Sequence, residues 1–142
     1  MKYHFKIHKE KETYWAECLE LPGCVTQGNT LKILNKNMEL ALNLYIEEPD
    51  NSKHIAPLPD TKIKTTKNIV SIPLNPKTAF SFLVRMHRIK NKMTQKKAAT
   101  AMGFDNVYSY QRLESKKCNP TLDVISRLKK VFPDISIDYA FS

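Results

Sequence analysis

Side chains that can contact a nucleic acid gather between residues 94 and 117. A helix that begins at Thr94-Gln95 presents unpaired backbone N–H groups in its first turn, and these form a ready binding site for a phosphate. In the helix that follows, Val107, Tyr110 and Leu113 are expected to point inward, which leaves polar and charged side chains outside. Such side chains hydrogen-bond base edges or phosphates in the major groove of DNA. The candidate DNA-binding residues are Thr94, Gln95, Lys96, Asn106, Tyr108, Ser109, Gln111, Arg112, Lys116 and Lys117.

The N-terminal residues lack the carboxylates that a two-metal nuclease requires. No acid precedes Glu10 in the first predicted strand, and Glu17 and Glu20 are too few and lie near the end of the next one. His4 and His8 share a face of the first strand, but without a third ligand we expect exposed histidines rather than a metal site. We therefore expect no enzymatic activity, no bound metal and no cofactor.

The charge is distributed unevenly along the chain. Residues 1–60 hold seven Lys and nine Asp or Glu, a net charge of −2, whereas residues 61–142 hold sixteen Lys or Arg and five Asp or Glu, a net charge of +11. A basic surface concentrated in one half favours a polyanionic partner, because neutralising phosphates releases condensed counterions. The alternatives are a solvated face that keeps the protein soluble and an ordinary helical bundle with a polar surface.

The composition predicts a cytoplasmic protein. No stretch approaches the roughly 18 uncharged apolar residues of a membrane helix, and the first residues are charged, unlike a secretory signal. The three cysteines lack a paired metal-binding spacing and indicate free thiols in a reducing compartment. We expect no membrane partner.

The N-terminal elements predict a small α+β domain. Alternation of apolar and polar residues indicates strands, and Thr30 can cap a helix in which Leu31, Leu34, Met38, Ala41 and Tyr45 recur at helical spacing. Trp15 is expected in the core. The predicted elements are strands at 3–9, 14–19 and 24–27, a helix from Thr30 that stops at Pro49, a proline-containing connection at 49–60, and a fourth strand of the same sheet at 68–74.

From Pro76 onward the apolar period is helical, which places the domain boundary near Asn75-Pro76. The first helix carries one stripe of Phe82, Met86, Ile89 and Met93 and another of Arg85, Arg88 and Lys92; its His87 is interpreted as a packing residue. Thr94 caps the second helix and Gly103 ends it. The third runs through Val107, Tyr110 and Leu113. Thr121 caps a fourth, with Leu122, Ile125, Leu128 and Phe132 inward until Pro133. Several short helices in a basic stretch indicate a helix-turn-helix domain.

Residues 93–122 resemble the helix-turn-helix of Cro and phage repressors. Met93-Thr94-Gln95 with Ala98-Ala99 and Met102-Gly103 is similar to the opening of that motif, and Arg112-Leu113-Glu114 with Asn119-Pro120-Thr121-Leu122 is similar to its close. The segment from Gly103 to Glu114 is one residue longer than is usual in the family. The start of the recognition helix, and with it the role of Asp105 and Asn106, is left open by this difference.

The N-terminal half resembles the antitoxin domain of HicB proteins. The similar residues are Tyr14-Trp15-Ala16-Glu17, Leu21-Pro22-Gly23-Cys24-Val25-Thr26-Gln27-Gly28, and Thr30-Leu31 leading to Ala41-Leu42 and Tyr45. The resemblance implies a partial RNase H-like domain that neutralises a small, basic, mRNA-cleaving toxin of the HicA type. It also implies a homodimer or larger homo-oligomer that represses its own operon by binding operator double-stranded DNA.

Together the two resemblances imply an antitoxin with two domains. Residues 1–75 form the toxin-binding domain, with a three- to four-stranded sheet and a helix, and residues 76–142 form an all-α DNA-binding domain. The alternative is a transcriptional repressor whose N-terminal domain senses a small molecule in a pocket lined by Tyr14, Trp15 and Tyr45.

Overall fold

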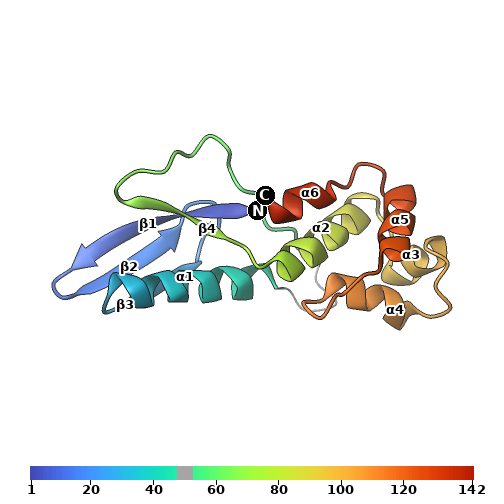
Figure 1. The fold of residues 1–142 in the computed structure, drawn as a ribbon, viewed down its shortest axis with the longest axis horizontal. Helices are drawn as coiled ribbons and strands as arrows, with labels where there is room; N and C mark the ends of the chain where they lie inside the picture. Colours follow the sequence, from blue (N-terminus) through green and yellow to red (C-terminus); the bar gives the residue numbers. More distant parts are fainter. Residues whose placement is uncertain (48–52) are drawn as a thin grey trace. The chain divides into compact units, whose positions relative to one another are not determined.

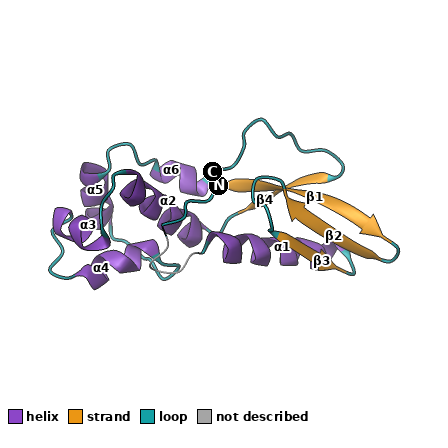
Figure 2. Cartoon of the chain, turned by 180° about the vertical axis from the view of Figure 1, so that it is seen from behind, coloured by secondary structure: helices purple, strands orange, loops and turns teal. Residues whose placement is uncertain are grey.

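The computed structural model describes residues 1–47 and 53–142, and it confirms an α+β protein. The described chain forms two compact units. The first comprises Met1–Ile46 and Ala56–Asn75, and the second comprises Pro76–Ser142 together with the described residues that lie between the two parts of the first. Strands belong to the first unit, and the second is helical (Figure 2).

The first unit is built on one antiparallel sheet. Its strands are β1 (Lys2–Glu10), β2 (Thr13–Cys18), β3 (Val25–Gly28) and β4 (Ile69–Pro73), in the order β3-β2-β1-β4. The alternation in β1 places Tyr3 and Phe5 on the buried face, where both are fully covered. The predicted fourth strand is confirmed, because β4 pairs with β1.

Helix α1 (Leu31–Ile46) lies across one face of this sheet (Figure 1). Thr30 caps it as expected, since its Oγ1 accepts a hydrogen bond from Ile33 N at 3.1 Å. The predicted apolar stripe is partly wrong, because Leu31 is 54% exposed and the buried residues recur every four positions instead. These are Leu34, Met38, Leu42 and Ile46. The helix ends at Ile46, and the predicted stop at Pro49 lies outside the described residues.

The loop that leads back to β4 is held to the sheet by polar contacts. Glu20, whose side chain is 3% exposed, accepts hydrogen bonds from the backbone N–H groups of His4 (2.9 Å) and Asp60 (3.1 Å). Its other close partner is His4 Nδ1 at 2.8 Å. The hydroxyl of Tyr3 donates to the carbonyl of Pro57 at 2.8 Å. His4 is therefore a structural residue and not the exposed histidine that the sequence predicts.

The face of the sheet opposite α1 carries a stacked aromatic pair. The rings of His8 and Trp15 lie 4.0 Å apart and nearly parallel, at 14°. His8 Nε2 is also 3.0 Å from a carboxylate oxygen of Glu17. The expectation that Trp15 is a core residue is wrong, because it is half-buried on this open face. His8 is likewise half-buried rather than exposed.

Gly28 is a point of close approach between β3 and α1. A Cβ atom at this position would lie 2.7 Å from Leu34 N and 2.9 Å from Leu34 Cα, both of them backbone atoms. We expect Gly28→Ala to push the helix off the sheet and to lower the free energy of unfolding by about 1–3 kcal/mol, as overpacking does. Thermal or urea unfolding of the full chain measures the effect.

Gly23 is the matched control for this prediction. Its φ is +87°, and a Cβ atom at this position would have no neighbour within 4 Å, so only backbone conformation restricts it. Asn tolerates positive φ, and Gly23→Asn should therefore remain close to the parent protein. Gly28→Asn should be as damaging as Gly28→Ala. Equal tolerance of Asn at the two positions would contradict the close approach of α1.

The second unit is an assembly of short helices. They are α2 (Pro76–Lys90), α3 (Gln95–Ala101), α4 (Val107–Gln111), the 3₁₀ turn η1 (Arg112–Glu114), α5 (Leu122–Val131) and α6 (Ile137–Phe141). Helix α2 is buried along nearly its whole length, including both Arg85 and Arg88. His87 is half-buried with its ring 6.3 Å from that of Phe132, which confirms its interpretation as a packing residue.

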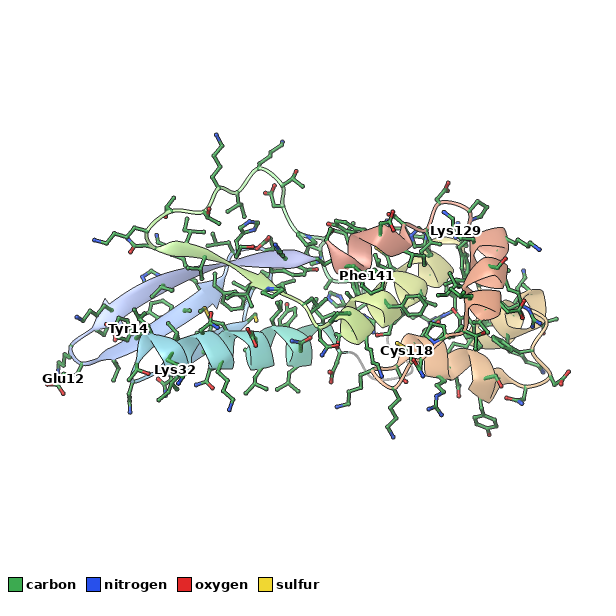
Figure 3. All side chains as sticks on the ribbon, viewed as in Figure 1. Glu12, Tyr14, Lys32, Cys118, Lys129 and Phe141 are labelled. Atoms are coloured by element: carbon green, nitrogen blue, oxygen red, sulfur yellow. The ribbon has the colours of Figure 1, made fainter. Side chains whose placement is uncertain are left out.

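Helix α5 corrects one detail of the predicted core. Thr121 caps it as expected, accepting from Val124 N at 3.2 Å, and Leu128 is fully buried. Leu122, predicted to point inward, is 86% exposed because it occupies the first position after the cap. At the other end of α5, Lys129 Nζ donates to two carbonyls of the next turn, those of Pro133 and Ile135 (Figure 3). Helix α6, which follows, has no counterpart among the predicted elements.

Candidate nucleic-acid interface

Helices α3 and α4 begin at side-chain caps and are separated by a tight turn. Thr94 Oγ1 accepts from Lys97 N at 3.0 Å, and Asn106 Oδ1 accepts from Ser109 N at 3.0 Å. Between them Gly103 has a φ of +76°, the left-handed conformation that ends α3. Both caps follow from local sequence, and the second settles where the helix starts: α4 begins immediately after Asn106.

The inward and outward faces of α4 are those that the sequence predicts. Tyr110 is fully buried and Leu113, in η1, is 5% exposed. On the opposite side Tyr108 is 75% exposed, and Ser109 and Arg112 are also exposed. The segment formed by α4 and η1 therefore presents the phenol of Tyr108, the hydroxyl of Ser109 and the guanidinium of Arg112 to solvent.

A buried ion pair fixes the ends of these helices to α2. Arg88 contacts Glu114 through two hydrogen bonds, Nε to Oε2 at 2.6 Å and Nη2 to Oε1 at 3.1 Å. The two side chains are only 10% and 4% exposed. Arg88 Nη1 also donates to the carbonyl of Met93 at 3.0 Å, directly before the cap of α3. One arginine on α2 thus holds the start of α3 and the end of η1 together.

Two glutamines extend this network. Gln95 Nε2 donates to Glu114 Oε1 at 3.2 Å, and Gln95 Oε1 accepts from Gln111 Nε2 at 3.0 Å. Both glutamines are half-buried, and the polar atoms of Gln95 are engaged within the unit. The sequence predicts them as DNA contacts, but this geometry favours a role in which they join the first turn of α3 to the last turn of α4. Asn106 is similarly occupied, because its side-chain oxygen caps α4.

The surroundings of Arg88 and Tyr110 fix the protonation states of these two side chains. Burial alone would lower the pKa of Arg88, but hydrogen bonding to Glu114 and the charge of that carboxylate outweigh it, so the pKa is raised. Burial raises the pKa of Tyr110, and the adjacent Glu114 raises it further. Arg88 therefore remains a cation, and Tyr110 a neutral phenol, throughout the physiological range.

Basic side chains surround the exposed face of α4. Lys96, Lys116 and Lys117 are all exposed, and residues 76–142 carry thirteen Lys or Arg against five Asp or Glu. Lys116 lies 3.6 Å from Glu47, a long and largely exposed ion pair that competes little with a phosphate. Among the residues that the structure describes, Lys96, Arg112 and Lys117 have no carboxylate partner.

Of the candidate residues, the structure places Thr94, Gln95 and Lys96 at the start of α3, Asn106 at the cap of α4, and the others on or after α4. The Gln95–Gln111 hydrogen bond shows that the two groups are adjacent. Sequence reasoning missed the Arg88–Glu114 pair as the element that positions them. The helical pattern puts Arg88 on a basic stripe, and nothing in its local sequence distinguishes a buried arginine from a solvated one.

No protein-family model and no curated protein matches this chain. Within the described residues, no helix combines the length and the apolar character needed to cross a membrane. The same residues contain no group of three or more His, Cys, Asp or Glu side chains arranged to hold a metal ion.

Proposed function

We propose that the second unit is a helix-turn-helix domain that binds operator DNA, with α4 as the recognition helix. The observation that carries this proposal is the exposed face of α4 and η1, where Tyr108, Ser109 and Arg112 are exposed. Lys96 and Lys117 are also exposed and have no carboxylate partner among the described residues. The major groove is wide enough for an α-helix, and α4 would enter it with its first turn. Thr94 and Lys96 would then contact the adjacent phosphates. In this proposal Arg112 reads a base or a phosphate, while Gln95, Asn106 and Gln111 position the two helices.

Operator binding should weaken steeply as salt rises, and it should depend on Arg112. Arg112→Ala is expected to cost on the order of 1–3 kcal/mol of binding if the guanidinium reads a base, and to lower the salt slope if it meets a phosphate. Fluorescence anisotropy with DNA from upstream of the gene, over a salt series, measures both quantities. The matched control is Lys130→Ala, which removes the same charge from an exposed position on α5. Affinity that is indifferent to salt and to Arg112→Ala would contradict the assignment.

We further propose that the first unit neutralises a basic, mRNA-cleaving toxin of the HicA type. The unit as folded is not acidic overall, because Lys62, Lys64 and Lys67 belong to it: it holds nine Lys and six Asp or Glu. The net charge of residues 1–60 is therefore no argument for a basic partner. The argument rests instead on individual acidic side chains near the open face of the sheet. The β1–β2 hairpin holds four Lys and three Glu, and two of these acids, Glu10 and Glu17, share the open face of the sheet with Trp15.

The open face of the sheet offers an anchor next to these acids. A groove of about 440 Å³ is lined there by Glu10, Thr13, Trp15, Val25, Thr26 and Gln27. Val25 is 53% exposed on the edge strand β3, and the indole N–H of Trp15 has no hydrogen-bond partner among the described residues. An edge strand can accept a strand from a partner, and aromatic anchors contribute most to interfaces. A basic toxin would find Trp15 and Val25 as apolar anchors, with Glu10 beside them.

The complete proposal is an antitoxin that also represses its own operon. Its partial RNase H-like first unit binds the toxin, and a homodimer or larger homo-oligomer presents two copies of α4 to the half-sites of a cytoplasmic operator. A second candidate, a repressor that senses a small molecule through the first unit, is favoured by a separate groove under α1. The two candidates do not exclude each other.

A further inference from the structure

A second groove lies on the face of the sheet that α1 covers. Its volume is about 600 Å³, within the range of small-molecule binding sites. It is lined by Ile7, Lys9, Tyr14, Leu31, Asn35, Met38, Lys67, Asn68 and Val70, all of which belong to the first unit. In Figure 3 Tyr14 is seen between the hairpin end of the sheet and the beginning of α1.

The groove exists because α1 covers the sheet unevenly. The helix packs chiefly against β3 and β2, and it makes few contacts with β1 and β4. The β1–β4 register pairs Phe5 with Val70, so Val70 and Ile7 share the face beneath α1, yet both are only half-buried. Met38, in contrast, is 2% exposed and forms an apolar wall. Side chains that a larger helix would cover are left available to a ligand.

The charge around this groove has one sign. Its two ionisable cations are Lys9 and Lys67, and no carboxylate belongs to the lining. Lys9 Nζ is 5.7 Å from the centroid of the Tyr14 ring, which holds the ammonium near the rim. Among the described residues neither lysine forms an ion pair. The amides of Asn35 and Asn68 supply the other polar groups.

We infer that this groove binds a small amphipathic anion, with an apolar body against Ile7, Met38 and Val70 and a carboxylate toward Lys9 and Lys67. The inference rests on the second candidate function and deepens it, because it names the class of small molecule that the first unit would sense. Neither operator binding nor toxin binding, as proposed above, uses this face. The sign of the charge argues against the toxin as the occupant, because a basic protein would meet two uncompensated lysines. Glu10 is the one charged residue in the lining of the other groove, so the two grooves present charges of opposite sign.

Decanoate is a suitable probe, since it combines a carboxylate with a flexible apolar chain. Titration of the full-length ¹⁵N-labelled protein, below the concentration at which decanoate forms micelles, should perturb amide signals around Ile7, Met38 and Val70. Decanol, which keeps the apolar body and lacks the charge, should bind more weakly. The double variant Lys9→Glu/Lys67→Glu should weaken decanoate binding about tenfold, because two attractions become two repulsions.

Two further variants separate the site from general charge and apolar effects. Lys64→Glu and Lys11→Glu together change the charge by the same amount at exposed positions outside the groove, and this control should bind decanoate like the parent. Val70→Trp should fill the groove and abolish the perturbations, while circular dichroism confirms an unchanged fold. The inference is overturned if decanol binds as tightly as decanoate, if the two double variants behave alike, or if the perturbed signals lie elsewhere.

Discussion

Replacing Glu114 by alanine is expected to unfold the helical unit at physiological temperature. The substitution leaves the Arg88 guanidinium buried without its carboxylate, and it also removes the acceptor of Gln95. Breaking a buried pair in this way costs roughly 3–5 kcal/mol, a large share of the stability of a small domain. Chemical unfolding followed by near-ultraviolet circular dichroism should show a separate, earlier transition for this unit.

Two comparisons distinguish the loss of a buried pair from the loss of any ion pair. Asp123→Ala removes an exposed ion pair with Arg127, in which Arg127 Nη2 lies 3.0 Å from Asp123 Oδ2 and the two side chains are 46% (Arg127) and 72% (Asp123) exposed. This substitution should cost ~0.5 kcal/mol or less. The double variant Arg88→Met/Glu114→Leu removes both buried charges and should recover most of the lost stability. If Glu114→Ala were as mild as Asp123→Ala, the buried network would have no energetic role.

The same network links stability to the proposed DNA interface. Arg88 bonds to Met93 and Glu114, and Glu114 bonds in turn to Gln95, so the first turn of α3 and the end of η1 move together. A base contact requires its side chain to be held within a fraction of an ångström, which a network of this kind provides. For this reason operator affinity of Glu114→Ala should be lost even at temperatures where the unit is still folded.

Elements with strong local signals were predictable from the sequence. Thr30, Thr94 and Thr121 each accept a hydrogen bond from an N–H three residues later, so these caps depend on local sequence only. Gly103 adopts the left-handed conformation expected of a helix end. The fourth strand was predictable because its β-branched residues are followed by Pro73, which ends it.

Features that depend on contacts between residues far apart in the sequence could not be predicted. Helix α1 is apolar on several sides, with Leu40 and Leu44 55% and 67% exposed, so periodicity alone could not choose the buried stripe. The pairing of Arg88 with Glu114 spans 26 residues and has no local signature. Glu20 and Asp60 are likewise brought together by the loop before β4. These contacts determine the roles of the residues, and the sequence shows only whether each side chain is polar or apolar.

The two proposed activities should be separable at the boundary between Asn75 and Pro76. A fragment of residues 1–75 contains the whole sheet and α1, and we expect it to fold, to co-purify with the proposed toxin, and to rescue cells that express that toxin. It should not retard operator DNA. The fragment 76–142 should bind DNA more weakly than the full chain, because two half-sites require a dimer.

Single substitutions in the full chain test the same division without truncation. Val25→Lys places a cation on the exposed edge strand beside the Trp15 groove. It should weaken toxin binding by about 2 kcal/mol or more and leave operator affinity unchanged. Arg112→Ala should have the reciprocal effect, impairing operator binding while toxin neutralisation persists. Growth rescue and anisotropy, measured on the same two variants, give four results that must form this crossed pattern. If Arg112→Ala released the toxin, or if only fragments containing α4 neutralised it, toxin binding would belong to the helical unit and the proposed assignment of the sheet would be wrong.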